Sequence, residues 1–211
     1  MSKGMMTLGL GLGLAMASAA NAGLVYNGGG GEIPDSVGGE PGVFTSEIVV
    51  GDSVELADIT VTLNGLNHTW AGDLIISISH SGGASSDLVH RVGRVGGAGF
   101  GDSSDYAGDY SFNDAFTGDL WAAAAGAGGG DPIPGGDYFA TGEGSDVQIS
   151  LLDVFGGIDI SGTWTLTISD NAGGDTGSLG GWTLGVVPVP APAAIAVLGL
   201  AGFAPRRRRS A

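Results

Sequence analysis

The 211-residue chain contains no cysteine, so disulfide bonds have no part in its stability. It is also poor in basic residues, with seven Lys and Arg against 22 Asp and Glu and a formal net charge of −15. Five of the seven lie in the terminal segments, so the chain between them keeps Arg91 and Arg94, and 2 minus 22 leaves a charge of −20. Nucleic-acid binding needs Lys and Arg to displace counterions from phosphates, so this composition excludes nucleic acid as a partner.

The N-terminal residues have the features of an export signal. Lys3 precedes an apolar stretch, Met5–Ala17, and the small residues Ala20-Asn21-Ala22 are typical of a cleavage site for signal peptidase. We therefore expect residues 1–22 to be a secretory signal peptide and the protein to be exported.

The C-terminal apolar run, Ala193–Ala204, is short, whereas about 20 apolar residues are needed to span a bilayer. A proline motif precedes the run and a basic cluster follows it: Pro188, Pro190 and Pro192, then Arg206, Arg207, Arg208 and Arg209. An apolar segment with a basic flank is typical of a membrane stop signal. Residues 188–211 are thus predicted to associate transiently with the membrane, and a plain C-terminal anchor is the alternative.

The order of these three parts resembles the bacterial PEP-CTERM sorting signal. The resemblance implies that an exosortase-like membrane protease recognises the proline motif and releases the protein to the cell surface or the extracellular space. The sequence departs from the usual Pro-Glu-Pro pattern, since it reads Pro188-Val189-Pro190-Ala191-Pro192, and Pro205 precedes the arginines.

Between the termini, apolar residues alternate with period two, which indicates half-buried strands. Four segments show the pattern clearly, with these side chains on the inward face: Ile59, Val61 and Leu63; Leu74, Ile76 and Ile78; Trp164, Leu166 and Ile168; and Trp182, Leu184 and Val186. Weaker patterns predict strands over residues 46–50, 88–91, 110–116 and 147–152. With Gly/Asp/Ser turns and no amphipathic helix, the pattern predicts an all-β, antiparallel β-sandwich of jelly-roll type over residues 46–187. We expect residues 23–45 to be a flexible Gly-rich lead-in and residues 122–137 to be a loop or short insertion.

Three motifs in order, His68–Gly83, Tyr110–Phe116 and Ser161–Val186, resemble the proprotein convertase P-domain, also called the P/Homo B domain. The resemblance covers roughly residues 32–187 and implies a β-sandwich that usually accompanies a subtilisin-like protease and assists it. No protease domain is recognisable in this sequence, so we expect a non-catalytic module rather than an enzyme.

Candidate catalytic bases are confined to His68, His80 and His90, and none stands in a recognisable catalytic motif. His68 matches the His-Thr segment of the P-domain resemblance and is expected to be a structural hydrogen-bonding residue. His80 and His90 end strand patterns and are expected to be solvated.

Three carboxylates, Asp73, Asp170 and Asp175, are the candidate metal ligands, because Gly-rich Asp turns supply the oxygens that Ca²⁺ prefers. The alternative is that these aspartates cap turns by accepting backbone N–H groups. A second acidic segment, Gly101–Asp119, is expected to be a solvated loop.

Trp164 and Trp182 are expected in the core, whereas Trp70 and Trp121 stand in Gly/Ala-rich segments where an exposed indole can stack on a sugar or a partner. The sequence favours an exported surface or extracellular-matrix binding or structural module, with surface proteins or extracellular polysaccharide as partners. The alternatives are a carbohydrate-binding accessory module and an unrecognised hydrolase that uses the acidic segment.

Overall fold

The computed structural model describes residues 23–190, which fold into strands, two short 3-10 turns and two helices. In chain order the elements are β1 (Leu24–Ile33), β2 (Gly42–Val50), β3 (Leu56–His68), η1 (Ala71–Asp73), β4 (Leu74–His80), β5 (Ser85–His90), η2 (Val95–Gly97), β6 (Asp105–Phe112), α1 (Leu120–Ala127), β7 (Pro132–Ile133), β8 (Gly136–Tyr138), β9 (Ala140–Thr141), β10 (Gln148–Ile149), α2 (Leu151–Phe155), β11 (Gly162–Asp170) and β12 (Gly177–Pro188).

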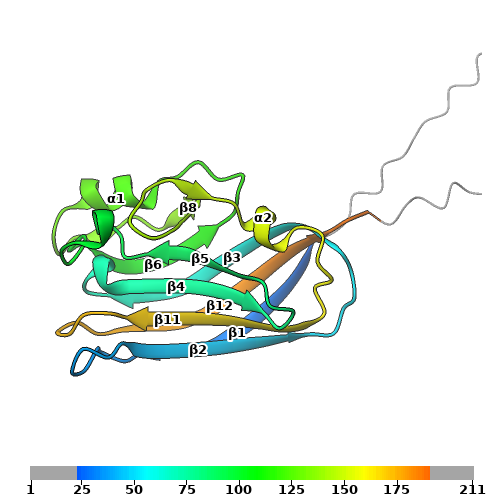
Figure 1. Cartoon of the computed structure of the whole chain (residues 1–211), viewed down its shortest axis with the longest axis horizontal. Helices are drawn as coiled ribbons and strands as arrows, with labels where there is room; N and C mark the ends of the chain where they lie inside the picture. Colours follow the sequence, from blue (N-terminus) through cyan, green and yellow to red (C-terminus); the bar gives the residue numbers. More distant parts are fainter. Residues whose placement is uncertain (1–22, 191–211) are drawn as a thin grey trace, which may run out of the picture.

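Two sheets pack face to face in Figure 1. One sheet has the strand order β1, β12, β3, β6, β7, with β8 also paired to β6, and the other has the order β2, β11, β4, β5. Strands β9 and β10 form a separate pair. Strands β7 and β8 run parallel to β6, and the long strands pair antiparallel. The predicted all-β, antiparallel sandwich is therefore confirmed.

The core lies between the sheets and consists of the alternating faces that the sequence predicts. The twelve inward side chains expected on β3, β4, β11 and β12 are all exposed by 1% or less. Both buried indoles are hydrogen-bonded: Trp164 Nε1 donates to Ile160 O at 3.0 Å, and Trp182 Nε1 donates to Ser46 Oγ at 3.0 Å. Trp164 and Trp182 are thus core residues, as predicted.

Residues 23–45 are not a flexible lead-in, and this expectation was wrong. Strand β1 pairs with β12 along its length, and residues 42–45 already belong to β2. The glycines of β1 serve packing rather than flexibility, because a Cβ at Gly28 would overlap the Trp182 indole and one at Gly30 would overlap the Leu179 carbonyl. Ser46 Oγ also donates to Gly29 O at 2.7 Å, which joins β1 to β2.

Helices form in two places where the sequence predicts a loop and a strand. The Ala-rich tract favours α1, and its first N–H groups are capped by Asp119, which accepts from Trp121 N and Ala122 N. In the predicted strand 147–152 only Gln148–Ile149 is extended, because Asp114 Oδ1 accepts from Leu151 N at 2.8 Å and supports the start of α2. A contact from a distant residue thus overrides the local pattern.

Strand β12 ends at Pro188, one residue beyond the expected boundary, and Val189 N donates to Glu55 O at 2.8 Å. Pro188 therefore belongs to the sandwich. The predicted signal peptide, Pro192 and Arg206 to Arg209 lie outside the described residues. Within residues 23–190, no helix is long and apolar enough to cross a membrane.

Candidate functional site

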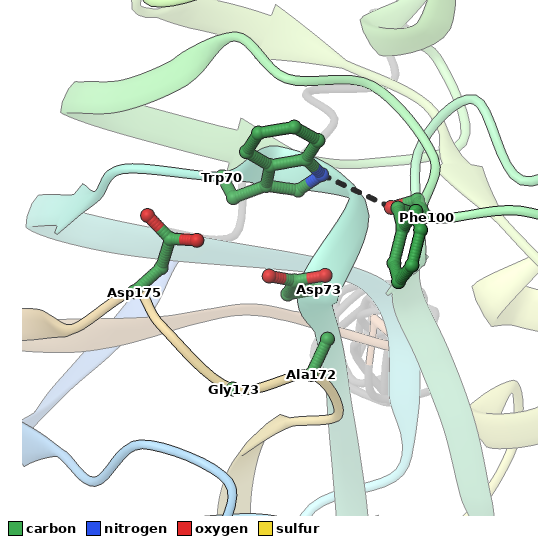
Figure 2. Close-up of a pocket in the computed structure, with 6 residues that line it drawn as sticks. All are labelled: Trp70, Asp73, Phe100, Ala172, Gly173 and Asp175. Atoms are coloured by element: carbon green, nitrogen blue, oxygen red, sulfur yellow. Dashed lines mark hydrogen bonds between the residues drawn. The ribbon is translucent and has the colours of Figure 1, made fainter.

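A pocket of about 280 Å³ opens at one end of the sandwich. Three segments far apart in sequence form it: the corner between β3 and β4, the loop between β5 and β6, and the turn between β11 and β12. Its lining residues are Trp70, Asp73, Phe100, Ala172, Gly173 and Asp175. Figure 2 shows the carboxylates of Asp73 and Asp175 between the Trp70 indole and the Ala172–Gly173 backbone, with Asp175 on the left and Phe100 on the right.

Backbone contacts fix the corner at residues 68–73 against the loop between β5 and β6. Gly72 N donates to Asp102 O and Ala71 N donates to Ser104 O, both at 2.8 Å. The approach is so close that a Cβ at Gly72 would overlap Phe100 O. Trp70 Nε1 donates to the same Phe100 carbonyl at 3.0 Å, which fixes the indole as one wall of the pocket (Figure 2).

A buried ion pair and a buried histidine–aspartate contact lie beneath the pocket. Arg91 Nη2 is 3.3 Å from Asp73 Oδ1, and Arg91 Nε donates to Gly72 O at 2.7 Å. His68 Nε2 is 3.3 Å from Asp170 Oδ2, and both side chains are fully buried. His68 is therefore a buried hydrogen-bonding residue, as predicted. Arg91 was not singled out by its sequence context, although a basic residue in so acidic a chain must find a carboxylate if it is buried.

The turn between β11 and β12 forms part of the rim of the pocket. Asp175 is half-buried there, and its Oδ1 accepts from Thr69 Oγ1 at 2.7 Å. Asn171 ties the turn to the corner, because its backbone N and its side-chain Nδ2 both donate to Asp73 O, at 2.9 and 3.0 Å. Asp35 accepts from Gly174 N at 3.1 Å and holds the far side of the turn. The structure thus brings the three candidate carboxylates to one end of the sandwich.

Burial is the largest cause that raises the pKa of Asp73, from 3.8 to about 6. The negative charges of Asp170 and, more weakly, Asp175 raise it further, while Arg91 and His68 act in the opposite direction. Burial also lowers the pKa of Arg91. The ion pair therefore compensates only part of the cost of ionising Asp73 in the folded protein.

Raising the pH is expected to destabilise the wild type relative to Asp73→Asn. The pKa of Asp73 is higher folded than unfolded, so the folded protein binds more protons between pH 3.8 and about 6. The contribution of protonated Asp73 to the free energy of unfolding is fully present below pH 3.8 and is lost as the pH rises through about 6. Melting temperatures of both proteins measure this, with Asp153→Asn on α2 as the matched control. A wild-type minus Asp73→Asn difference that stays constant across this range would contradict the assignment.

The carboxylates do not converge as free ligands for calcium. Arg91 and His68 already contact Asp73 and Asp170, and the part of the chain that the structure describes places no group of three or more Asp, Glu, His or Cys side chains to hold a metal ion. Calcium would have to displace Arg91 from Asp73 to gain the six to eight oxygens that it prefers.

The sequence leaves two alternatives for Asp73, Asp170 and Asp175, calcium ligands or turn caps, and a direct test separates them. A metal that binds only the folded state raises the melting temperature, whereas screening acts without site geometry. Because Asp73 and Asp170 already contact Arg91 and His68, we expect CaCl₂ and NaCl of equal ionic strength to shift the melting temperature equally. A larger shift in CaCl₂ that disappears in Asp170→Asn would establish the calcium site.

The other sequence candidates have structural partners elsewhere. His80 Nε2 lies 3.0 Å from Ser161 O, and His90 Nδ1 lies 2.8 Å from Asp87 Oδ2, so both imidazoles are half-buried and bonded rather than freely solvated. In the acidic segment 101–119, four carboxylates accept backbone N–H groups and cap turns or helices: Asp102, Asp109, Asp114 and Asp119. This arrangement gives the hydrolase alternative no support.

The two remaining tryptophans differ from each other. Trp121 on α1 is only 8% exposed and belongs to the core, whereas Trp70 is half-buried on the pocket wall. Phe100, which also lines the pocket, is 71% exposed and was not identified from the sequence, because its Gly-rich surroundings give no periodic signal.

Comparison with known proteins gives one family match. Two solved structures are similar. The serine protease of Aeromonas sobria has 16% sequence identity and a TM-score of 0.42, and the match covers 82% of this chain and 28% of that chain. The complex of that protease with the chaperone ORF2 has 15% identity and a TM-score of 0.40, and the match covers 83% of this chain and 28% of that chain. The match thus spans little more than a quarter of those chains. No curated protein matches the sequence. Residues 138–186, which include β11 and most of β12, match the family described as Proprotein convertase P-domain.

Proposed function

We propose that the protein is an exported, non-catalytic module of the cell surface or extracellular matrix, and that it binds its partner through the pocket at the end of the sandwich. The pocket itself is the main observation behind this proposal. It presents the partly accessible rings of Trp70 and Phe100 and the carboxylate of Asp175. The P-domain match supports a module that assists other proteins. Surface proteins are the first candidate partners.

The position of the pocket suits display from a surface. The β11–β12 turn opens one end of the sandwich, while β12 runs to the opposite end, where β1 begins (Figure 1). Twelve residues of strand separate the two ends, which corresponds to about 40 Å. If the segment after Pro188 associates with the membrane, the pocket faces away from it.

Extracellular polysaccharide is the second candidate partner. The Trp70 indole offers an apolar face beside two carboxylates, an arrangement that can receive the face and the hydroxyl groups of a sugar ring.

Retention on the surface fraction of producing cells tests the proposal. Tagged full-length protein and the variants Trp70→Ala and Phe100→Ala are incubated with that fraction, and the bound amounts are compared. We expect both variants to be retained less than the wild type. Val49→Ala is the control, because Val49 is 77% exposed on β2 and outside the pocket. Equal retention of all four proteins would contradict binding through the pocket.

Processing by an exosortase-like protease is the other part of the proposal, and it rests on the terminal signals of the sequence. We expect the mature protein to lack residues 1–22 and the segment after about Pro192, because cleavage there leaves β12 and its contact with Glu55 intact. Intact-mass measurement of protein from the cell surface or medium checks this. A recovered species that still carries Arg206 to Arg209 would contradict it.

A further inference from the structure

The pocket combines two aromatic rings with acidic groups. The Trp70 indole and the Phe100 ring lie side by side, Asp73 lies in the centre, and Asp175 lies on the side away from Phe100 (Figure 2). Phe100 is 71% exposed although nothing in the sandwich requires an exposed ring at this position. Together with the half-buried Trp70 indole beside it, this ring forms an aromatic surface of the kind that receives ligands.

The side-chain hydrogen-bond donors at the pocket are already used by the protein. Trp70 Nε1 donates to Phe100 O, Thr69 Oγ1 donates to Asp175 Oδ1, and Gly174 N donates to Asp35. Beneath the pocket, Arg91 Nε donates to Gly72 O.

Two carboxylate oxygens of the pocket, by contrast, remain free to accept hydrogen bonds. Asp73 is only 2% exposed, and its Oδ1 accepts from Arg91. Its Oδ2, and the Oδ2 of Asp175, accept no hydrogen bond from the described residues. A pocket whose lining side chains offer free acceptors but no free donor favours a ligand that donates, and the charged side chains that only donate at neutral pH are those of Lys and Arg.

Charge points to the same chemistry. Arg91 compensates Asp73 and His68 contacts Asp170, whereas among residues 23–190 Asp175 has only the Thr69 hydroxyl as a hydrogen-bond partner. Arg94, in the loop between β5 and β6, donates through Nε to Gly99 O. With 22 acidic residues against Arg91 and Arg94 between the terminal segments, the domain attracts basic partners over long distances.

We propose that this pocket is a receptor for a basic side chain, arginine or lysine, presented by a protein partner. The cationic head group lies against the Trp70 and Phe100 rings in a cation–π contact and donates to the free oxygens of Asp73 and Asp175. Aromatic rings supply none of the oxygen ligands that a metal ion needs, so they favour an organic cation over calcium. The proposal rests on the proposed function and names the chemistry that the same pocket recognises.

Calorimetric titration of the full-length protein with acetyl-arginine-amide tests the proposal, with acetyl-citrulline-amide as a ligand of the same shape but without the charge. We expect saturable binding of the arginine compound and none of the citrulline compound. Asp175→Asn should weaken binding by about tenfold or more, because it removes a charge-assisted hydrogen bond. Asp153→Asn on α2, exposed and outside the pocket, is the control for the change in net charge and should bind like the wild type.

Trp70→Ala, checked for a wild-type circular dichroism spectrum, should also weaken binding. Equal binding of arginine and citrulline compounds, or equal affinities of Asp175→Asn and Asp153→Asn, would overturn the proposal. So would titration heat from an oligosaccharide or CaCl₂ but not from the arginine compound. If Trp70→Ala lowers retention on the surface fraction but the free arginine compound does not, the pocket binds a partner that is not a basic side chain. If the arginine compound binds at the pocket but Trp70→Ala does not change retention, the proposed surface function is wrong instead.

Discussion

Replacing Trp164 with alanine is expected to lower the free energy of unfolding by about 3 to 5 kcal/mol. The side chain is fully buried on β11 and packs against the Phe155 ring, with the ring centroids 5.2 Å apart. Truncation leaves a cavity between the sheets and removes the donor that pairs with Ile160 O. A domain of ordinary stability, about 5 to 15 kcal/mol, loses much of its margin through this change.

Urea unfolding of the wild type and the variant measures the effect. Trp70→Ala is the matched control, because the same truncation at a half-buried pocket wall removes less apolar area from the core. We expect Trp70→Ala to cost clearly less than Trp164→Ala. Equal costs at the two positions would mean that the inward face of β11 is assigned wrongly.

Removing the charge of Arg91 is expected to cost about 3 to 5 kcal/mol at neutral pH, because it leaves Asp73 as a buried carboxylate without its partner. Arg91→Met keeps most of the length of the side chain and loses the guanidinium. Since the pKa of Asp73 is already raised to about 6, the cost should be smaller below that pH, where the carboxyl group takes up a proton.

A double-mutant cycle separates the ion pair from the lost packing. Arg91→Met combined with Asp73→Asn should cost less than the sum of the single changes, because no unpaired charge remains. Arg94→Met is the control, since its Nε donates to the exposed Gly99 carbonyl and surface changes of this kind stay within about 0.5 kcal/mol. Additive costs for Arg91 and Asp73 would contradict the pairing.

The core strands could be predicted because period-two alternation reports directly on burial. Ile59 on β3 and Trp182 on β12 are buried, as the alternation of apolar and polar residues along these strands predicts. Strand β1 could not be predicted in the same way, because its glycines carry no pattern and are explained by close neighbours such as the Trp182 indole at Gly28 and the Leu179 carbonyl at Gly30. Helix α2 was missed because it is short and its start is supported by Asp114, which is far away in sequence, as well as by the local cap Ser150.

The candidate site was predicted in part. The sequence singled out Asp73, Asp170 and Asp175, and the structure brings them to one end of the sandwich. It could not give the ion-pair partner Arg91 or the pocket residue Phe100, because the loop between β5 and β6 reaches the site through backbone contacts such as Gly72 N to Asp102 O. Backbone pairing between distant segments has no sequence signature of its own.

Binding of the partner at the pocket beside Trp70 and Phe100 can be observed residue by residue. Amide and indole NMR spectra of isotope-labelled protein are recorded with and without solubilised surface material from producing cells. We expect the changed signals to cluster at Trp70, Phe100 and the turn of residues 171–175. Changes confined to the edge strands β1 and β2, with the Trp70 indole signal unmoved, would contradict it.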